Sequence, residues 1–284
     1  MNLEIGTQAD PGSTITSSFS GDVISIKLVV NLLKAIQITK DATCHVVEEG
    51  LMFSAGDNSR VVAVAYVKKN MFENYRRSNT VFVPFAIDLA ALVNCLSIVS
   101  LATGVLSDTC SLFYDGNGGP FEIMREDINA HVVTKCKVNT YDIDGNNATI
   151  EMRDDFMESF QVIMKASALV NVFYEIDSTC ERVTMSFSPV DNSFRLTGKG
   201  TKGSWEMKYH HDSGSFISFK CEEEISFSYH YSYIMACTKA LIHATRVHLR
   251  FTPNGILCML LQIEAPKQEG YVEFTVLPSE SIAE

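Results

Sequence analysis

The order of strand-like and helix-like segments occurs twice along the chain, and this repeat constrains the fold more than any local motif. In the first half, the apolar periods predict a strand at 18–24, a helix at 26–38, strands at 42–47, 51–55, 61–67 and 79–84, a helix at 87–99, and strands at 109–115, 121–126 and 130–139. In the second half, they predict a strand at 159–165, a helix at 166–176, strands at 182–188, 193–199, 204–209 and 215–221, a helix at 232–244, and strands at 247–251, 256–264 and 271–277. The sequence therefore predicts two copies of one α+β domain, aligned so that Gly50 corresponds to Asn192.

An acidic stretch at 141–158 separates the two copies and has no sustained apolar period, so we interpret it as a linker. The segment 1–17, which contains Ser, Thr, Gly and Pro, is typical of a disordered tail. We therefore expect a domain at 18–140, the linker at 141–158, a second domain at 159–278 and a short tail at 279–284.

Composition limits the classes of protein that fit this layout. With 46% apolar residues in 284, the chain can bury a large core, and its net charge of −11 argues against a protein that coats nucleic acid with its whole surface. The eight cysteines lie far apart without a CxxC motif, which favours buried reduced thiols in the cytosol or nucleus over disulfides or a zinc site. Polar residues interrupt the apolar stretch 85–106, so we expect an amphipathic helix and a soluble chain rather than a membrane span.

Candidate metal and catalytic motifs are weak. Residues 142–146 begin like an EF-hand loop, but the positions that need Gly and Glu hold Asn147 and Arg153. Four acids of the linker could in principle bind metal ions for phosphodiester cleavage. They are Glu151, Asp154, Asp155 and Glu158. Because an irregular linker would not hold two ions at a fixed spacing, we expect no metal, no cofactor and no catalytic residues.

Basic residues on predicted helices carry more information than these acids. Lys27 and Lys34 share the polar face of the first helix, Lys165 begins its counterpart in the second half, and Lys239 lies on the last helix. A solvated helix surface would explain any one of them. A ring with its helices turned inward would instead gather them around a central hole, where phosphate contacts need no base-specific geometry.

Several segments, in their order and spacing over residues 19–279, resemble one known family. They are LLKAIQITKDATCHVVEEGLMFSAGDNSRVVAVAYVKKNMFENY, LVNCLSIVS, VVTKCKVNT, FSPVDNSFRLTGKG, CTKALIHATRVHLRFTPNGILCMLLQIE and GYVEFTVLPSE. The resemblance is to the Rad-one family, whose members are subunits of the nine-one-one checkpoint clamp. It implies a sliding-clamp fold with antiparallel sheets outside and helices lining a ring around double-stranded DNA.

The resemblance also implies partners and a function. It implies a heterotrimer with Rad-nine and Hus-one type subunits, loading by a dedicated clamp loader, recruitment of checkpoint kinase signalling and repair proteins, and a nuclear location without enzyme activity. Two alternatives remain at this point: a homotrimeric replication clamp and a 3'-5' exonuclease. Asn94 and Ser97 depart from the pattern, because replication clamps often have basic residues at these helix positions.

Three sets of site residues follow from the resemblance. The DNA-facing set has Lys34 and Lys239 at hole-lining positions, with Lys27 and Lys165 added from the helical pattern. The subunit-interface set lies on the expected edge strands 130–139 and 204–209: Val132, Val133, Lys135, Cys136, Trp205, Met207 and Tyr209. The partner-peptide pocket is expected beside the linker: Val61, Ala63, Ile256, Leu277 and Pro278.

Overall fold

The computed structural model describes residues 18–57, 60–78, 83–101, 110–116, 118–127, 131–143, 155–266 and 268–279. The first half contains β1 (Phe19–Val23), α1 (Ile26–Ala35), β2 (Asp41–Val47), β3 (Gly50–Asp57), β4 (Val61–Lys68), the 3-10 turn η1 (Lys69–Met71), β5 (Phe72–Arg77), β6 (Phe85–Asp88), α2 (Leu89–Leu101), β7 (Cys110–Tyr114), β8 (Phe121–Asp127), β9 (Val132–Val138) and β10 (Thr140–Tyr141). The expected N-terminal tail and linker residues 144–154 lie outside the described residues.

The second half contains β11 (Phe160–Lys165), α3 (Ala166–Glu175), β12 (Arg182–Ser188), β13 (Ser193–Gly200), β14 (Gly203–His210), β15 (Phe216–Cys221), β16 (Ile225–His230), α4 (Tyr231–Leu241), β17 (Arg246–Phe251), β18 (Leu257–Ala265) and β19 (Gln268–Val276). From β1 to β9 and from β11 to β19, strands and helices follow in the same order, apart from η1. The chain therefore has an α+β fold in which the described elements occur twice in one order.

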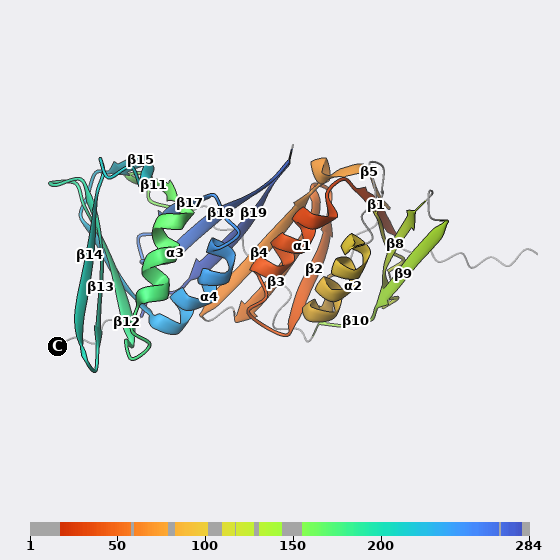
Figure 1. The fold of residues 1–284 in the computed structure, drawn as a ribbon, viewed down its shortest axis with the longest axis horizontal. Coiled ribbons are helices and arrows are strands. Elements are labelled where there is room, and N and C mark those ends of the chain that lie inside the picture. The colour runs from red at the N-terminus through yellow and green to blue at the C-terminus, as the bar shows by residue number, and fades with distance from the viewer. Residues whose placement is uncertain are drawn as a thin grey trace, which may run out of the picture.

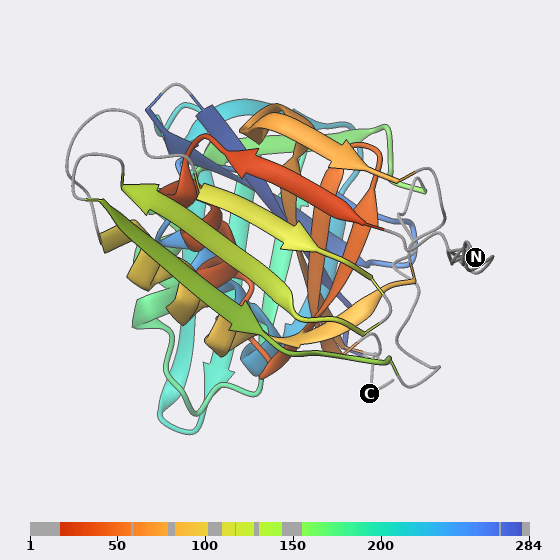
Figure 2. The same ribbon diagram turned by 90° about the vertical axis from the view of Figure 1, so that its right-hand side faces the viewer.

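Three antiparallel sheets form the outer layer, and the helices pack on one side of them (Figure 1). The strand orders are β5-β1-β7-β8-β9, then β10-β6-β2-β3-β4-β19-β18-β17-β11-β15, and β14-β13-β12-β16. The ten-stranded sheet crosses from one half to the other through the pair β4–β19. Figure 2 shows the five-stranded sheet with β9 along its edge, and Figure 1 places β9 and β14 at opposite ends of the long axis.

The core lies between the helices and the sheets, as the amphipathic pattern of α1 illustrates. Leu28, Leu32 and Leu33 are fully buried, and Ser25 caps the helix by accepting a hydrogen bond from the backbone N–H of Leu28 at 3.4 Å. Helix α1 packs over β19 at Gly270, where a Cβ atom would come within 2.8 Å of the Leu32 side chain. The apolar face of α1 thus packs on the strand that joins the two halves.

Two parts of the sequence-based layout need correction. Of the strand expected at 79–84, the structure describes only Val83 and Pro84, which belong to no strand and lie just before β6. Residues 79–82 lie outside the described residues. Strand β5 lies earlier, at Phe72–Arg77, and sequence reasoning missed it because several side chains of this edge strand are exposed and charged. Strand β16 was missed as well, although Ile225, Phe227 and Tyr229 alternate with Ser226 and Ser228 in the way expected of a half-buried strand.

Candidate nucleic-acid and subunit interfaces

Two of the predicted DNA-facing lysines come together where α1 packs against α4. Lys34 lies in the last turn of α1 and Lys239 in the last turn of α4, and both side chains are exposed. The Lys239 ammonium donates to the backbone oxygen of Gln37 at 3.5 Å. Burial and then the charge of Lys34 lower the pKa of His243, just after α4. We call Lys34, Lys239 and His243 the junction cluster; it brings two exposed cations and a histidine to one place.

The other two predicted lysines differ in position. Lys27 lies two turns before Lys34 on the exposed face of α1, about 10 Å away along the helix axis. Lys165 ends β11 and alternates with the buried Val162 and Met164, so it belongs to the sheet face turned away from the helices. The structure therefore groups Lys27 with the junction cluster and separates Lys165 from it.

Helices α2 and α3 lack such cations on their exposed faces. On α2, Asn94 is exposed and the Ile98 side chain is 57% exposed. On α3, Tyr174 is 58% exposed and Glu175 is also exposed. Within the described helices, positive charge is thus concentrated at α1 and α4, which suits phosphate contacts without base recognition.

The described residues contain no group of three or more His, Cys, Asp or Glu side chains placed to hold a metal ion. Of the linker acids, Asp155 and Glu158 are described, while Glu151 and Asp154 lie outside the described residues.

The predicted interface strands are both edges of their sheets. Strand β9 pairs only with β8, and β14 pairs only with β13, within the part of the chain that the structure describes. Val132 and Val133 on β9 are about half exposed, at 53% and 52%. Both edges therefore leave backbone groups for a further strand.

Some side chains of β14 pack against the rest of the protein, and others are exposed. The indole Nε1 of Trp205 donates to the sulfur of Cys180 at 3.3 Å, and the Tyr209 hydroxyl donates to the Ala168 carbonyl at 2.9 Å. Both predicted interface residues are thus turned toward the body of the protein. Met207, between them, is 38% exposed. Trp205 and Tyr209 hold the edge strand in place, and Met207 contributes most to its apolar surface.

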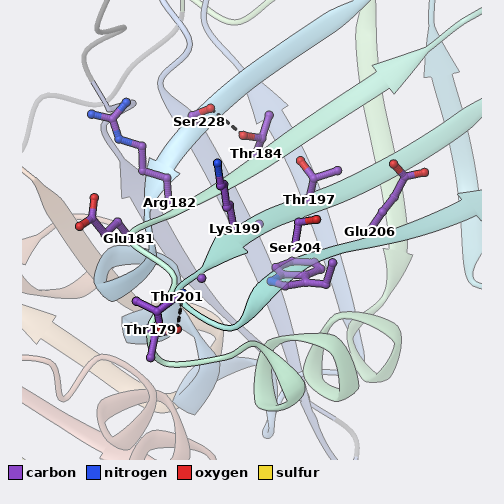
Figure 3. A pocket seen from close by; sticks show the side chains of 13 residues that line it. Thr179, Glu181, Arg182, Thr184, Thr197, Lys199, Thr201, Ser204, Glu206 and Ser228 are labelled. Atoms are coloured by element: carbon purple, nitrogen blue, oxygen red, sulfur yellow. Dashed lines mark hydrogen bonds between the residues drawn. The ribbon is translucent and has the colours of Figure 1, made fainter.

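A shallow hollow of about 730 Å³ lies beside β14 on the four-stranded sheet (Figure 3). Its lining is rich in hydroxyl groups and includes the cations Arg182 and Lys199. Thr184 and Ser228 are hydrogen-bonded to each other at 2.7 Å. Histidine and cysteine are missing from the residues that line it, so the hollow offers no activated nucleophile.

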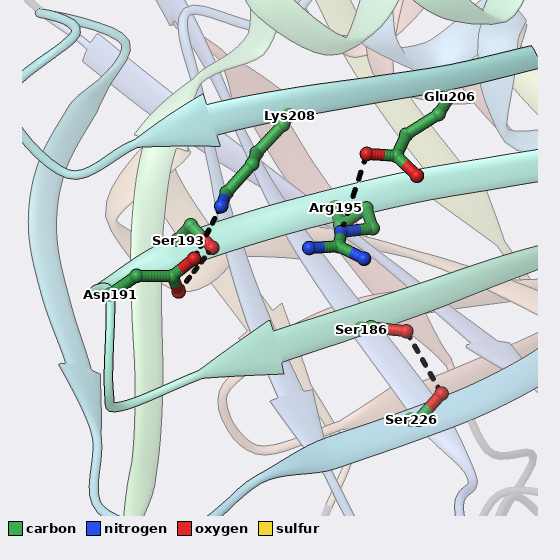
Figure 4. Close-up of polar contacts among 7 residues, drawn as sticks. All are labelled: Ser186, Asp191, Ser193, Arg195, Glu206, Lys208 and Ser226. Atoms are coloured by element: carbon green, nitrogen blue, oxygen red, sulfur yellow. Dashed lines mark hydrogen bonds and ion pairs between the residues drawn. The ribbon is translucent and has the colours of Figure 1, made fainter.

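Many polar side chains on the outer surface of this sheet form hydrogen bonds or ion pairs with one another (Figure 4). Lys208 forms an ion pair with Asp191, and Arg195 forms one with Glu206 at 3.6 Å. The side-chain hydrogen bond from Lys208 is the first cause that holds the pKa of the Asp191 carboxyl well below its usual range. The charges on β14 are therefore paired across the sheet.

The structure changes the residue set of the predicted peptide pocket. One end of the sheet does bring together Val61, Leu277 and Ile256. There the Leu277 N–H donates to the Arg60 carbonyl at 3.0 Å, and β18 pairs with β19. Pro278, the next residue, is half-buried. Ala63, however, is fully buried in the core and cannot contact a docked peptide.

A groove of about 560 Å³ lies on the outer side of this region. It is lined by Val62 rather than by its neighbours Val61 and Ala63, and by Tyr141 and Ile143 at the start of the expected linker. The segment VVAVAYV is apolar on both faces of β4, so alternation along the sequence could not decide which face lines this groove.

Comparison with known proteins gives consistent matches over most of the chain. A family model described as "Repair protein Rad1/Rec1/Rad17" matches residues 18–263. The human cell cycle checkpoint protein RAD1 is 28% identical over 268 residues, which cover 92% of this chain and 91% of the human protein. The DNA damage checkpoint control protein rad1 of Schizosaccharomyces pombe is 25% identical over 293 residues, covering 94% and 88%. The Drosophila melanogaster DNA repair protein Rad1 is 23% identical over 278 residues, covering 96% and 98%. None of the described helices is long and apolar enough to span a membrane.

Proposed function

The chain belongs to the Rad1/Rec1/Rad17 family of repair proteins, and from this membership we propose that it is a DNA damage checkpoint clamp subunit, as the names of its relatives indicate. It forms a heterotrimeric ring with Rad-nine and Hus-one type subunits. A clamp loader places the ring on double-stranded DNA in the nucleus, where it recruits checkpoint kinase signalling and repair proteins. The subunit acts by encircling DNA and not by catalysis.

The strand pair β4–β19 carries the proposal. By element order, β14 is the counterpart of β4, and β9 is the counterpart of β19. The chain therefore contains one copy of a strand junction and the two separate halves of a second copy at its ends. Pairing β14 of one subunit with β9 of another repeats the internal junction, and such head-to-tail contacts generate rings when the rotation closes.

The ring model assigns a role to the helix layer. Repetition of the β4–β19 geometry keeps the helices of every subunit on the inner side, where Lys27 and the junction cluster face DNA phosphates. Because α2 and α3 offer few charges of that sign, this subunit holds DNA weakly, and the ring retains it by topology.

The groove on the outer side of β4 is the proposed docking site for partner proteins. It combines the exposed aromatic ring of Tyr141 with the apolar side chain of Val62 and the backbone of the linker start. A short peptide with an apolar anchor fits this chemistry. Val61, Ile256, Leu277 and Pro278 then support the neighbouring sheet end.

The solution mass of the purified chain, alone and mixed with Rad-nine and Hus-one type subunits, tests the assignment. A monomer that enters a one-to-one-to-one complex supports the checkpoint clamp. A homotrimer of this chain alone would instead identify a replication-type clamp, and a monomer in both samples would contradict the ring. Metal-dependent cleavage of DNA ends that Asp154→Ala with Asp155→Ala abolishes would favour the exonuclease alternative.

A further inference from the structure

The cysteines divide into two groups by exposure. Six of the eight are buried, and the two half-exposed ones are Cys95 and Cys136. Cys95 lies in α2 and Cys136 in β9, two elements that pack against each other. Cys136 lies near enough to Cys95 to raise the pKa of its thiol. The two thiols that solvent can reach are therefore neighbours.

We propose that Cys95 and Cys136 are an oxidative modification site, at which hydrogen peroxide or an organic hydroperoxide closes a reversible disulfide between α2 and β9. The pair comes from distant parts of the first half, and only the fold brings it together. A sulfur–sulfur bond is about 2.05 Å long, so its formation fixes the spacing of β9 and α2 at this point. An edge strand bonded on one side has more freedom to adjust to that spacing than a central strand.

The chemistry divides the two thiols into an attacking and a resolving group. Burial first, and then the neighbouring Cys136, raise the pKa of Cys95, which favours Cys95 as the resolving thiol. The attack is assigned to Cys136, which lies on the edge strand β9. Its thiolate attacks one peroxide oxygen, the O–O bond breaks, and hydroxide or alkoxide leaves. Cys95 then attacks the resulting sulfenic sulfur, the S–O bond breaks, and water leaves. Two thiols lose two electrons and two protons, and the peroxide is reduced to two water molecules, or to water and an alcohol.

The buried thiols do not compete for this reaction. Cys110 lies near Cys136, whose charge acts on it, but it is 1% exposed and burial raises its pKa to about 12. Burial likewise raises the pKa of Cys258 to about 12. Both thiols stay protonated and shielded at neutral pH, so oxidation selects the partly exposed pair.

The crosslink would lie directly behind the edge of β9, which the proposed function assigns to a neighbouring subunit. Cys136 alternates with Lys135 and Lys137, and its side chain packs toward α2 while the strand edge remains free. A disulfide that ties β9 to α2 constrains the twist of this edge. Peroxide thus controls assembly through residues that themselves stay inside one subunit.

The test uses the full-length chain by itself, so its outcome does not depend on whether the ring exists. The reduced chain is treated with hydrogen peroxide, free thiols are blocked with N-ethylmaleimide after unfolding, and intact mass and peptide maps are recorded. The expected product has two fewer blocked thiols, a Cys95–Cys136 crosslinked peptide, and full recovery after dithiothreitol.

Cys95→Ser and Cys136→Ser should each abolish the crosslink, while Cys110→Ser, which removes a buried thiol near Cys136, should retain it. The wild-type peptide map decides the matter even where a variant folds poorly. A crosslink between any other pair, an irreversible acid at Cys136 without a crosslink, or unchanged thiols would overturn the proposal.

Discussion

The internal strand junction and the two free edges are counterparts in the repeat, yet their side chains differ. Strand β4 has no charged residue between Val61 and Val67, and the one charge in the paired stretch of β19, Glu273, is paired with Arg250 at 3.2 Å. Strand β9 instead carries Lys135 and Lys137, and β14 carries Glu206 and Lys208. An edge that stays paired throughout the life of the chain can be apolar, whereas an edge that is free before assembly needs charges against non-specific pairing.

The first prediction breaks the internal junction. Phe274 is fully buried on β19 opposite Ala63, so Phe274→Ala should lower the free energy of unfolding by about 3–5 kcal/mol through the cavity it creates. Urea denaturation followed by circular dichroism measures this loss. The matched variant Val133→Ala on the free edge should stay within about 0.5 kcal/mol of the wild type, because its side chain is half exposed. Equal losses in the two variants would contradict the distinction between junction and edge.

A second prediction separates assembly from folding. Val132→Glu with Val133→Glu places two charges on the free edge of β9 and should weaken binding of the neighbouring subunit at least tenfold, about 1.4 kcal/mol. Analytical ultracentrifugation or calorimetry of mixed subunits measures the affinity. Ile217→Glu is the control, because Ile217 is 46% exposed on β15, an edge strand that is no counterpart of the internal junction. If both variants assemble equally well, β9 is not the interface strand.

This comparison also shows how far sequence reasoning reached. The repeat was predictable because it follows from the order of segments along the chain, and both edge strands were predicted through the resemblance to the clamp family. The predicted alignment of Gly50 with Asn192 is out of register by one residue. The pattern of buried and half-buried side chains from Leu51 onward matches the pattern from Phe194 onward, and not the pattern from Ser193. The β12–β13 turn is two residues longer than the β2–β3 turn, and a turn can lengthen without any change in the apolar pattern of the strands.

Site residues were harder to predict than the fold. The meeting of Lys34 with Lys239 depends on the packing of α1 on α4, which joins residues far apart in the chain. Lys165 stands at the boundary of a strand and a helix, where the two periods assign its side chain to different faces, so its contact with DNA stays a prediction. The contact of Cys95 with Cys136 left no trace in the sequence at all, since a helix and an edge strand fix it together.

A third prediction concerns the difference between the helix pairs. The double variant Lys34→Glu with Lys239→Glu should preserve folding and assembly but reduce DNA retention. If each lysine contacts one phosphate, the slope of the logarithm of the DNA-binding constant against the logarithm of the salt concentration should fall by about 2 in magnitude. Filter binding or single-molecule sliding over a salt series with the assembled ring measures the effect. The control pair Lys69→Glu with Lys220→Glu has the same charge change on exposed residues away from the helices. An unchanged slope in the first pair would remove the junction cluster from the DNA path.

The smallest expected effect is a pH dependence of the free energy of unfolding, caused by one histidine on each side of the internal junction. His45 on β2 and His248 on β17 lie in the ten-stranded sheet, and the Nε2 atom of each is buried without a hydrogen-bond partner among the described residues. Burial lowers the pKa of both, and for His248 the charge of Arg250 lowers it further. The unfolded chain therefore binds more protons than the folded one below about pH 6.5, the ordinary histidine value, and the free energy of unfolding should fall as pH drops from 7 through this value toward the folded pKa.

Urea unfolding at a series of pH values, compared between the wild type and His45→Gln with His248→Gln, tests this dependence. The double variant cannot take up these two protons, so its stability should vary less between pH 7 and pH 5. The same slope in the wild type and the double variant would show that other groups, and not these two histidines, control stability in this range.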